Sequence, residues 1–405
     1  MKSMLSKKIF SWFYKFQEKQ FVPKKEEVDN DSIKDLSKRL KSDTYKETLT
    51  NILEWQDRNL KFWEERWLTF MVLLVISYLS IIIILWRTLE INPSSTIILV
   101  LGLVLLFIIE RDILNFIFYL ITIFVFFIVY VLLLVYRIQE VSINYNTLFF
   151  IVMVSLLLGA FISIIIHLLI KYRNIKLMIP QFKIKDTFKM SLPIEKILEY
   201  RLSICRDYAK LTSTLLLNIY PKNEIFFVLV PQHVAVGIKI DKKMYILDQK
   251  LPILTLEKWA EKRRERLRKK ILKVQFAKIT KEEDNIKIDW SLPHYQTNKI
   301  SQIDEKINIH EFTVRLKKKL KIKRIVKDTN LENYLEVPIT LKNYFYFYGE
   351  DEIIEFSIIE AIKNKLEDEL TGNIKNINSI TIEQRGTDLI LKINLVKRKN
   401  GKRKD

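Results

Sequence analysis

The feature that most constrains this chain is a long apolar region between Trp67 and Ile170. Its tightest interruption is Glu110-Arg111-Asp112, a charged turn that can lie at a membrane surface but not in hydrocarbon. A helix needs roughly 20 mostly apolar residues to cross a bilayer. The pattern therefore predicts a transmembrane region at 67–170 with about four helices, at 67–86, 91–109, 113–136 and 147–170.

Positive charges on both sides of this region predict its orientation. Lys and Arg are frequent before the first span, and Lys171, Arg173 and Lys176 follow the last one. Cytoplasmic flanks carry such an excess, and an even number of spans leaves both termini on one side. We therefore expect a multi-pass protein of the cell membrane whose soluble domain and both termini are cytoplasmic.

Composition limits the partners and cofactors. The formal net charge is +20, which favours anionic partners. For a tethered chain the lipid bilayer and its anionic headgroups are the simpler expectation, and nucleic acid is not expected. The single cysteine excludes an intramolecular disulfide, and the four scattered histidines predict no metal site. The seven glycines form no phosphate-binding loop, so we expect no cofactor.

The chain divides into segments by composition. Residues 1–66 predict a basic, amphipathic, helical region, whose first 20 residues fit either an interfacial helix or a helix packed on the protein. Residues 258–309 predict a basic helix and linker, with eight Lys or Arg between Lys262 and Lys273 that fit a solvated face or a contact with anionic headgroups. Residues 310–405 predict a C-terminal α+β region that ends in a basic tail.

A compact unit of helices followed by strands is predicted at 185–257. The helical pattern covers Pro193–Tyr220 and breaks near Ser203, where a second helix can begin. Short strands are expected at Ile225–Val230, His233–Ile240 and Met244–Leu247. In the C-terminal region we expect strands at 312–316, 345–348, 380–383 and 389–395, with a helix at 351–370.

One group of residues in that unit suggests chemistry. Cys205 precedes the run Arg206-Asp207-Tyr208-Ala209 where the second helix begins, and a helix N-terminus stabilises a thiolate. His233 opens a strand 28 residues later, and Asp248 closes the next strand after a further 15 residues. A thiol nucleophile needs a base and a group that orients the base. On residue types alone, Cys205 also fits a small buried hydrophobe, and His233 a packed or solvated histidine.

These residues give the chain a family resemblance. Cys-Arg-Asp-Tyr-Ala, a histidine opening a strand and then Tyr-Ile-Leu-Asp resemble the transglutaminase-like superfamily, over about residues 190–260. With a multi-pass region before this core, the chain looks like an archaeal membrane branch of that superfamily. The resemblance implies a papain-like fold in which Cys205 is the nucleophile, His233 the general base and acid, and Asp248 its orienting group. The chain departs from the family with Ser203, where Gly is frequent, and with Val234-Ala235-Val236, where an aromatic residue is frequent.

The predicted fold class is thus α+β. It combines a four-helix transmembrane region, a papain-like and transglutaminase-like α+β domain, and a small C-terminal α/β region. The expected function is cysteine-dependent acyl transfer on amide bonds of a protein or peptide substrate through a thioester, by peptidase, amidase or transamidase chemistry. The alternative is a non-catalytic membrane scaffold that uses the fold to bind protein or peptide. A transporter ranks last, because no intramembrane charge or broken helix is evident beyond His167.

Overall fold

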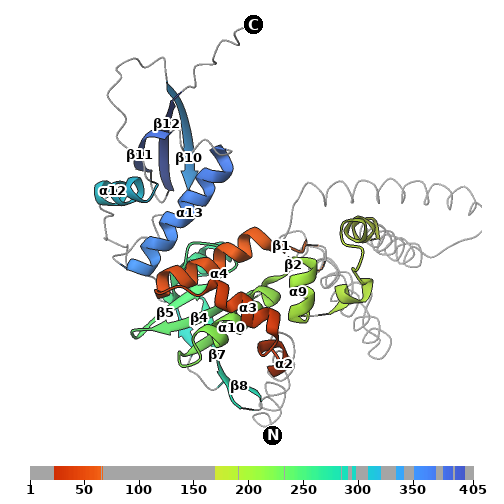
Figure 1. Ribbon diagram of the computed structural model, residues 1–405. Coiled ribbons are helices and arrows are strands. Elements are labelled where there is room, and N and C mark those ends of the chain that lie inside the picture. Colours follow the sequence, from red (N-terminus) through yellow and green to blue (C-terminus); the bar gives the residue numbers. More distant parts are fainter. Residues whose placement is uncertain are drawn as a thin grey trace, which may run out of the picture. The chain divides into compact units, whose positions relative to one another are not determined.

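In the computed structural model the chain divides into two compact units, Met1–Phe62 with Ser191–Asp405, and Trp63–Met190. The structure describes residues 22–64, 66, 169–189, 191–231, 233–283, 285–290, 294–297, 309–320, 334–341, 351–370, 377–385 and 388–396. Figure 1 shows the first unit as helices and sheets that carry most of the described residues.

The predicted transmembrane region is corrected. No helix among the described residues is long and apolar enough to cross a membrane. This finding contradicts the four-helix transmembrane part of the predicted fold class and the multi-pass localisation with cytoplasmic domain and termini. The four segments at 67–86, 91–109, 113–136 and 147–170 lie outside the described residues, apart from 169 and 170. The described helices fail for a physical reason, since their apolar residues form faces that pack on the protein and are interrupted by charges.

The first unit has a mixed α+β architecture. Its larger sheet has seven strands in the order β6-β5-β4-β3-β7-β8, with β9 paired to β7, and every pairing is antiparallel. The strands are β3 (Ile225–Val230), β4 (His233–Ile240), β5 (Lys243–Leu247), β6 (Leu254–Thr255), β7 (Lys273–Lys281), β8 (Ile286–Asp289) and β9 (Tyr295–Gln296). All six residues of β3 are buried, as expected for a strand with neighbours on both sides and an apolar sequence.

The helix α10 (Cys205–Ile219) forms the centre of the core. It packs on β3 and β4 and also contacts α2 (Lys25–Val28), α3 (Asp31–Leu40), α4 (Tyr45–Asn59) and α9 (Ile194–Tyr200). Its apolar side chains are almost completely buried, and Leu211, Leu215 and Leu216 are each 0% exposed. Burial of this face, at about 25 cal/mol per Å² of apolar surface, makes α10 the element on which the surrounding helices and strands are assembled.

Polar contacts also connect α4 to the beginning of α10. The side-chain amide of Gln56 donates to Thr212 Oγ1 at 2.7 Å, and both residues are buried. The hydroxyl of Tyr208 donates to the carbonyl oxygen of Leu60 at 3.1 Å. Just after Leu60, the short strand β1 (Lys61–Phe62) pairs in parallel with β2 (Leu202–Ser203), which directly precedes α10. The first turn of α10 is therefore tied to a segment far away in the sequence.

The C-terminal part of the first unit has a three-stranded antiparallel sheet in the order β10-β12-β11. Its elements are α12 (Ile309–Lys319), β10 (Tyr334–Leu341), α13 (Glu352–Leu370), β11 (Ile377–Arg385) and β12 (Asp388–Val396). The helix predicted at 351–370 and the strands at 380–383 and 389–395 are confirmed. The strand predicted at 312–316 is wrong, because the same apolar residues form one face of α12, with Phe312 and Leu316 buried at helical spacing. The strand predicted at 345–348 lies outside the described residues, and β10 was not predicted.

The second unit is described over a short stretch only. Residues 169–178 are helical, and Ile184–Phe188 form a 3-10 helix. The rings of Trp63 and Tyr172 both pack against Phe182, with centroids 5.3 and 6.2 Å from it. Arg66 Nε donates to the carbonyl oxygen of Lys189 at 2.8 Å.

Candidate active site

Cys205 is the first residue of α10 and is 6% exposed. At this position the helix has backbone N–H groups without intrahelical acceptors, and these groups favour a negative charge. The predicted break in the helical pattern is real, because α9 ends at Tyr200 and Arg201 adopts a left-handed backbone with φ 54°. The chain then passes through β2 and begins a new helix at the cysteine.

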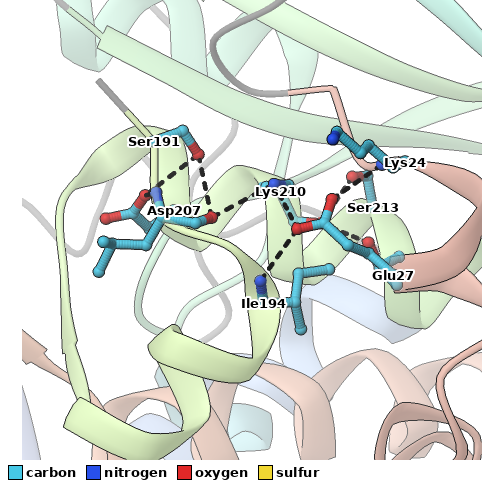
Figure 2. Close-up of polar contacts among 9 residues, drawn as sticks. Lys24, Glu27, Ser191, Ile194, Asp207, Lys210 and Ser213 are labelled. Carbon is cyan, nitrogen blue, oxygen red and sulfur yellow. Dashed lines mark hydrogen bonds and ion pairs between the residues drawn. The ribbon is translucent and has the colours of Figure 1, made fainter. Parts of the chain in front are cut away.

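Asp207 holds the beginning of that helix in place. Its carboxylate accepts a hydrogen bond from the backbone N–H of Ile204 at 3.1 Å. Ile204 directly precedes Cys205, so this bond caps the N-terminus of α10. The same carboxylate accepts the backbone N–H of Leu192 at 2.9 Å and the hydroxyl of Ser191 at 3.2 Å, as Figure 2 shows in part. Asp207 is 0% exposed, so these three donors replace water for its charge. The Asp207 carboxylate, two residues from the thiol, therefore has a structural role, because it holds backbone N–H groups in place.

A second polar group extends this arrangement toward the N-terminal helix α2. Lys210 donates to Glu27 Oε1 at 2.7 Å and to the carbonyl oxygen of Leu192 at 3.2 Å. Glu27 also accepts the backbone N–H groups of Ile194 at 3.1 Å and Lys24 at 2.8 Å (Figure 2). This ion pair, with a buried lysine and a half-buried glutamate, thus joins α2, the beginning of α9 and the second turn of α10.

The β4–β5 hairpin brings the other two predicted residues together. Its turn residues Asp241 and Lys242 have φ of 47° and 67°, as a two-residue turn between right-twisted strands requires. The resulting register pairs Val236 with Leu247. Continued by one residue, this register places Asp248 across from Ala235, on the same face as His233 and diagonal to it.

The structure brings Cys205, His233 and Asp248 into one group. His233 Nε2 lies 2.8 Å from Asp248 Oδ1. The His233 ring also lies close enough to the Cys205 thiol for each group to shift the pKa of the other. Because Nε2 faces the carboxylate, Nδ1 is the ring nitrogen left for the sulfur. The side chains of His233 and Asp248 are 12% and 18% exposed, so the group is largely removed from water.

Electrostatics favour the charged pair of a thiolate and an imidazolium. Burial raises the pKa of the Cys205 thiol, but the hydrogen bond and charge of His233, the charge of Arg206 and the backbone N–H of Val234 outweigh burial and lower it. Burial lowers the pKa of His233, but Asp248 and the contact with Cys205 outweigh burial and raise it, while Arg263 opposes them. Both shifts move a proton from sulfur toward the ring.

The helix α11 (Leu256–Arg266) supplies two further contacts to Asp248. Trp259 Nε1 donates to Asp248 Oδ2 at 2.9 Å, and Arg263 Nη2 donates to the same oxygen at 2.5 Å. The two residues are four apart on the helix and therefore share a face, and the Arg263 guanidinium lies over the Trp259 ring at 5.7 Å. The charged helix predicted in this region thus turns one face toward the site.

Arg263 balances the charge of Asp248. Its Nη2 lies 2.5 Å from His233 Nε2 as well as 2.5 Å from the carboxylate. A guanidinium only donates hydrogen bonds, so it cannot take the place of Asp248 as the acceptor of the Nε2 proton. Burial raises the pKa of Asp248, but His233 and Arg263 hold it well below its ordinary value. The carboxylate stays ionised as a partner for His233.

Among the described residues, no group of three or more His, Cys, Asp or Glu side chains could hold a metal ion. The predicted strands at Ile225–Val230 and His233–Ile240 are present with those bounds, and β5 begins one residue before its predicted start. Sequence reasoning missed Trp259, Arg263 and the role of Asp207. The four-residue spacing of Trp259 and Arg263, on a helix that closely follows Asp248, is the signal that could have identified these two.

The thiol at the start of α10, the imidazole that opens β4 and the carboxylate directly after β5 form the arrangement of the papain-like class of site that the sequence predicts. Comparison with known proteins agrees with this class. Residues 160–277 match a family model described as a transglutaminase-like domain, so this part of the chain is similar to such a domain.

A curated relative is also similar to this chain. The chain is similar to UPF0252 protein MJECL39 of Methanocaldococcus jannaschii, at 33% identity over 197 residues, which cover 48% of this chain and 52% of that protein. The match thus spans about half the length of the relative. No solved structure matches the chain. These matches support the superfamily, and they do not extend to the predicted multi-pass membrane branch.

Proposed function

We propose that the transglutaminase-like domain is a cysteine-dependent acyl-transfer enzyme with Cys205 as nucleophile, His233 as general base and acid, and Asp248 as the orienting group. The observation that carries this proposal is the position of His233 between the sulfur of Cys205 and the carboxylate of Asp248. Orientation of a base by a fixed carboxylate is what nucleophilic catalysis by a thiol requires.

In the first half of the reaction, the Cys205 thiolate attacks the carbonyl carbon of an amide and forms a C–S bond. The developing oxyanion is stabilised by backbone N–H groups at the beginning of α10, with the N–H of Cys205 itself as one donor. The C–N bond then breaks, and His233 gives its proton to the leaving amine. A thioester on Cys205 remains.

In the second half, water or an amine attacks the thioester carbonyl. His233 takes a proton from the attacking group, and the C–S bond breaks to return the thiolate. Attack by water makes the domain a peptidase or amidase, and attack by an amine makes it a transamidase. Asp248 stabilises the imidazolium in both halves and holds the ring in the tautomer that faces Cys205.

The single cysteine makes the proposal directly testable. The rate of alkylation by iodoacetamide should be followed against pH on the full chain, with His233→Ala as the comparison. We expect the wild-type profile to give a thiol pKa below the ordinary value of about 8.5, and the variant to lose this shift. A wild-type thiol that titrates at or above the ordinary value would refute the activated nucleophile.

A second measurement addresses acyl transfer itself. Intact-protein mass spectrometry after exposure to activated acyl esters should detect one acyl group on the wild-type chain and none on Cys205→Ala. Decay of that adduct in water, and its faster decay with added amine, would separate hydrolysis from transamidation. A wild-type chain that remains unacylated while its thiol is reactive would favour a binding role for the fold.

A further inference from the structure

A short loop carries Asp248, the carboxylate of the candidate site. It connects β5, which ends at Leu247, to β6, which begins at Leu254. Directly after Asp248, Gln249 adopts a left-handed backbone with φ 41°. This conformation is unfavourable for a residue other than glycine and persists only where surrounding contacts hold the chain. The loop that presents the carboxylate therefore depends on contacts from other elements.

The C-terminal helix α13 provides a contact at each end of this loop. After the loop, the backbone N–H of Ile253 donates to Ser357 Oγ at 3.0 Å. Before the loop, the hydroxyl of Tyr245 on β5 donates to Asp351 Oδ2 at 2.7 Å. Asp351 directly precedes α13, and its Oδ1 accepts the backbone N–H of Ile353 at 3.1 Å, so its carboxylate is fixed to the helix. One helix thus holds both ends of the loop.

The contact at Ser357 is the deeper of the two. Ser357 and Ile253 are each 0% exposed, so water cannot replace either partner. The Ser357 hydroxyl donates its proton to the carbonyl oxygen of Ile354 at 2.7 Å. A hydroxyl has one proton and two lone pairs, so the oxygen remains an acceptor for the N–H of Ile253. The position of Ser357 on α13 therefore sets where the loop ends.

The helix α13 is itself fixed on α4. Asn364 Nδ2 donates to Glu54 Oε1 at 2.9 Å, and Arg58 Nη2 donates to Asn364 Oδ1 at 2.8 Å. A further residue of α4, Asp57, pairs with Lys250 of the loop, with Nζ 2.5 Å from Oδ1. The same helix contacts α10 through the buried amide–hydroxyl hydrogen bond described above. The loop of the carboxylate and the helix of the nucleophile are therefore both referred to α4.

The end of the loop also leads into the helix that supplies donors to Asp248. The helix α11 begins three residues after Ile253, and its residues Trp259 and Arg263 donate to the Asp248 carboxylate. Both the carboxylate and these donors are thus connected to the segment that Ser357 holds. Reacting groups in an active site must be held to within about 0.5 Å, so a shift of this segment disturbs the carboxylate and its donors together.

We propose that Ser357 and, at the other end of the loop, Asp351 are positioning residues that keep Asp248 in place beside His233. The inference rests on the proposed function, because both residues act on acyl transfer only through the Asp248–His233 contact. They lie outside the family match, which ends at residue 277. The C-terminal region thereby gains a role in the reaction.

The pH dependence of iodoacetamide alkylation tests positioning separately from stability. Against the effect of burial, Asp248 raises the pKa of His233, and His233 in turn lowers the pKa of the Cys205 thiol. Ser357→Ala removes the acceptor of the buried N–H and should let the carboxylate shift away from the ring. The alkylation midpoint should then lie about 0.5 to 1 pH unit higher, which is about a 3- to 10-fold change in the ionisation constant.

Thr297→Val is the matched control. Thr297 Oγ1 accepts the backbone N–H of Leu272 at 2.9 Å, and the two residues are 1% and 0% exposed. Leu272 directly precedes β7, just as Ile253 directly precedes β6, and β7 is separated from β5 by β4 and β3. Both variants should lower the urea midpoint, and only Ser357→Ala should move the alkylation midpoint. An equal move in both variants, or none in Ser357→Ala, would overturn the proposal.

Tyr245→Phe extends the test to the other anchor and replaces Ser357→Ala if that variant does not fold. The ring of Tyr245 is retained, and Asp351 keeps the N–H of Ile353 and the ammonium of Lys243 as partners. We expect an upward move of the alkylation midpoint that is smaller than in Ser357→Ala, because the tyrosine anchor is less deeply buried. An unmoved midpoint in a folded Tyr245→Phe chain would refute the role of Asp351, and it would overturn the whole proposal where Ser357→Ala does not fold.

The two proposals fail in different ways. A wild-type thiol with a lowered pKa, whose profile is the same in Ser357→Ala, refutes the positioning role and leaves acyl transfer intact. A wild-type thiol with an ordinary titration refutes the proposed function, and the positioning role falls with it.

Discussion

Replacement of Asp207 by alanine should loosen the beginning of the nucleophile helix by a large and calculable amount. The wild-type carboxylate accepts the backbone N–H groups of Ile204 and Leu192 and the hydroxyl of Ser191. Ile204 is 5% exposed and Leu192 is 0% exposed, so water cannot replace the lost acceptor at either N–H group. The Ser191 hydroxyl is only partly buried and can find another partner.

The expected magnitude follows from the two orphaned donors. A buried donor that loses its partner costs about 1–3 kcal/mol, and more when the partner was charged. Loss of a favourable charge at a helix N-terminus adds about 0.3–1 kcal/mol. The opening free energy of α10 should therefore fall by about 4 kcal/mol, which corresponds to roughly a 1000-fold loss of protection at about 1.4 kcal/mol per tenfold change.

Native-state hydrogen exchange of the α10 amides, measured by mass spectrometry, reports this local free energy. Thr214→Val is the matched control, because Thr214 Oγ1 also donates inside α10, at 2.8 Å to the carbonyl oxygen of Lys210. That carbonyl can keep its helical N–H partner, so the control should cost less than about 1 kcal/mol. The reasoning would be refuted if Asp207→Ala lowered the protection of α10 no more than Thr214→Val does.

Three other changes test the contacts around the trio. Arg263→Gln removes a cation that lowers the pKa of His233. In a pH–rate profile of acyl transfer, the alkaline limb, which reports the deprotonation of His233, should therefore move to higher pH. An alkaline limb that stays in place would contradict this role of Arg263. Asp248→Asn should lose less stability than the wild type as the pH falls below about 5. The depressed pKa of Asp248 stabilises the wild-type fold above the ordinary carboxyl pKa of about 3.9, and this stabilisation is lost as the pH falls further. Urea midpoints measured between about pH 5 and 2 test this, and equal losses in the two proteins would argue against the linkage. Ser203→Ala should keep or slightly raise the thermal midpoint, because the Ser203 hydroxyl is buried and has no hydrogen-bond partner among the described residues. A fall in the free energy of unfolding of more than about 1 kcal/mol would show that the hydroxyl has a partner.

Local patterns predicted much of the catalytic region. The continuous apolar run at Ile225–Val230 and the alternation that begins at His233 predicted strands with the observed bounds, because buried antiparallel strands carry β-branched and aromatic residues. The break before Cys205 was visible in the helical period. The same reasoning failed at 312–316, where a short apolar run fits a strand and a helix equally well.

The membrane prediction failed for a related reason. It depended on apolar run length, a property that takes no account of what an apolar segment packs against. In the part of the chain that the structure describes, apolar residues are buried by neighbouring elements of the same unit, as α10 is by β3, β4 and α3. Only the tertiary arrangement gives that information.

The sequence by itself determined the order of Cys205, His233 and Asp248 and the local element on which each lies. Helix and strand periods are properties of neighbouring residues, and a single thiol in the chain left one candidate nucleophile. The tertiary structure decided what surrounds them. The approach of α11, with Trp259 and Arg263 against Asp248, and the hold of Asp207 on Leu192 join residues from different elements. Such contacts depend on the packing of whole elements, which no local period encodes.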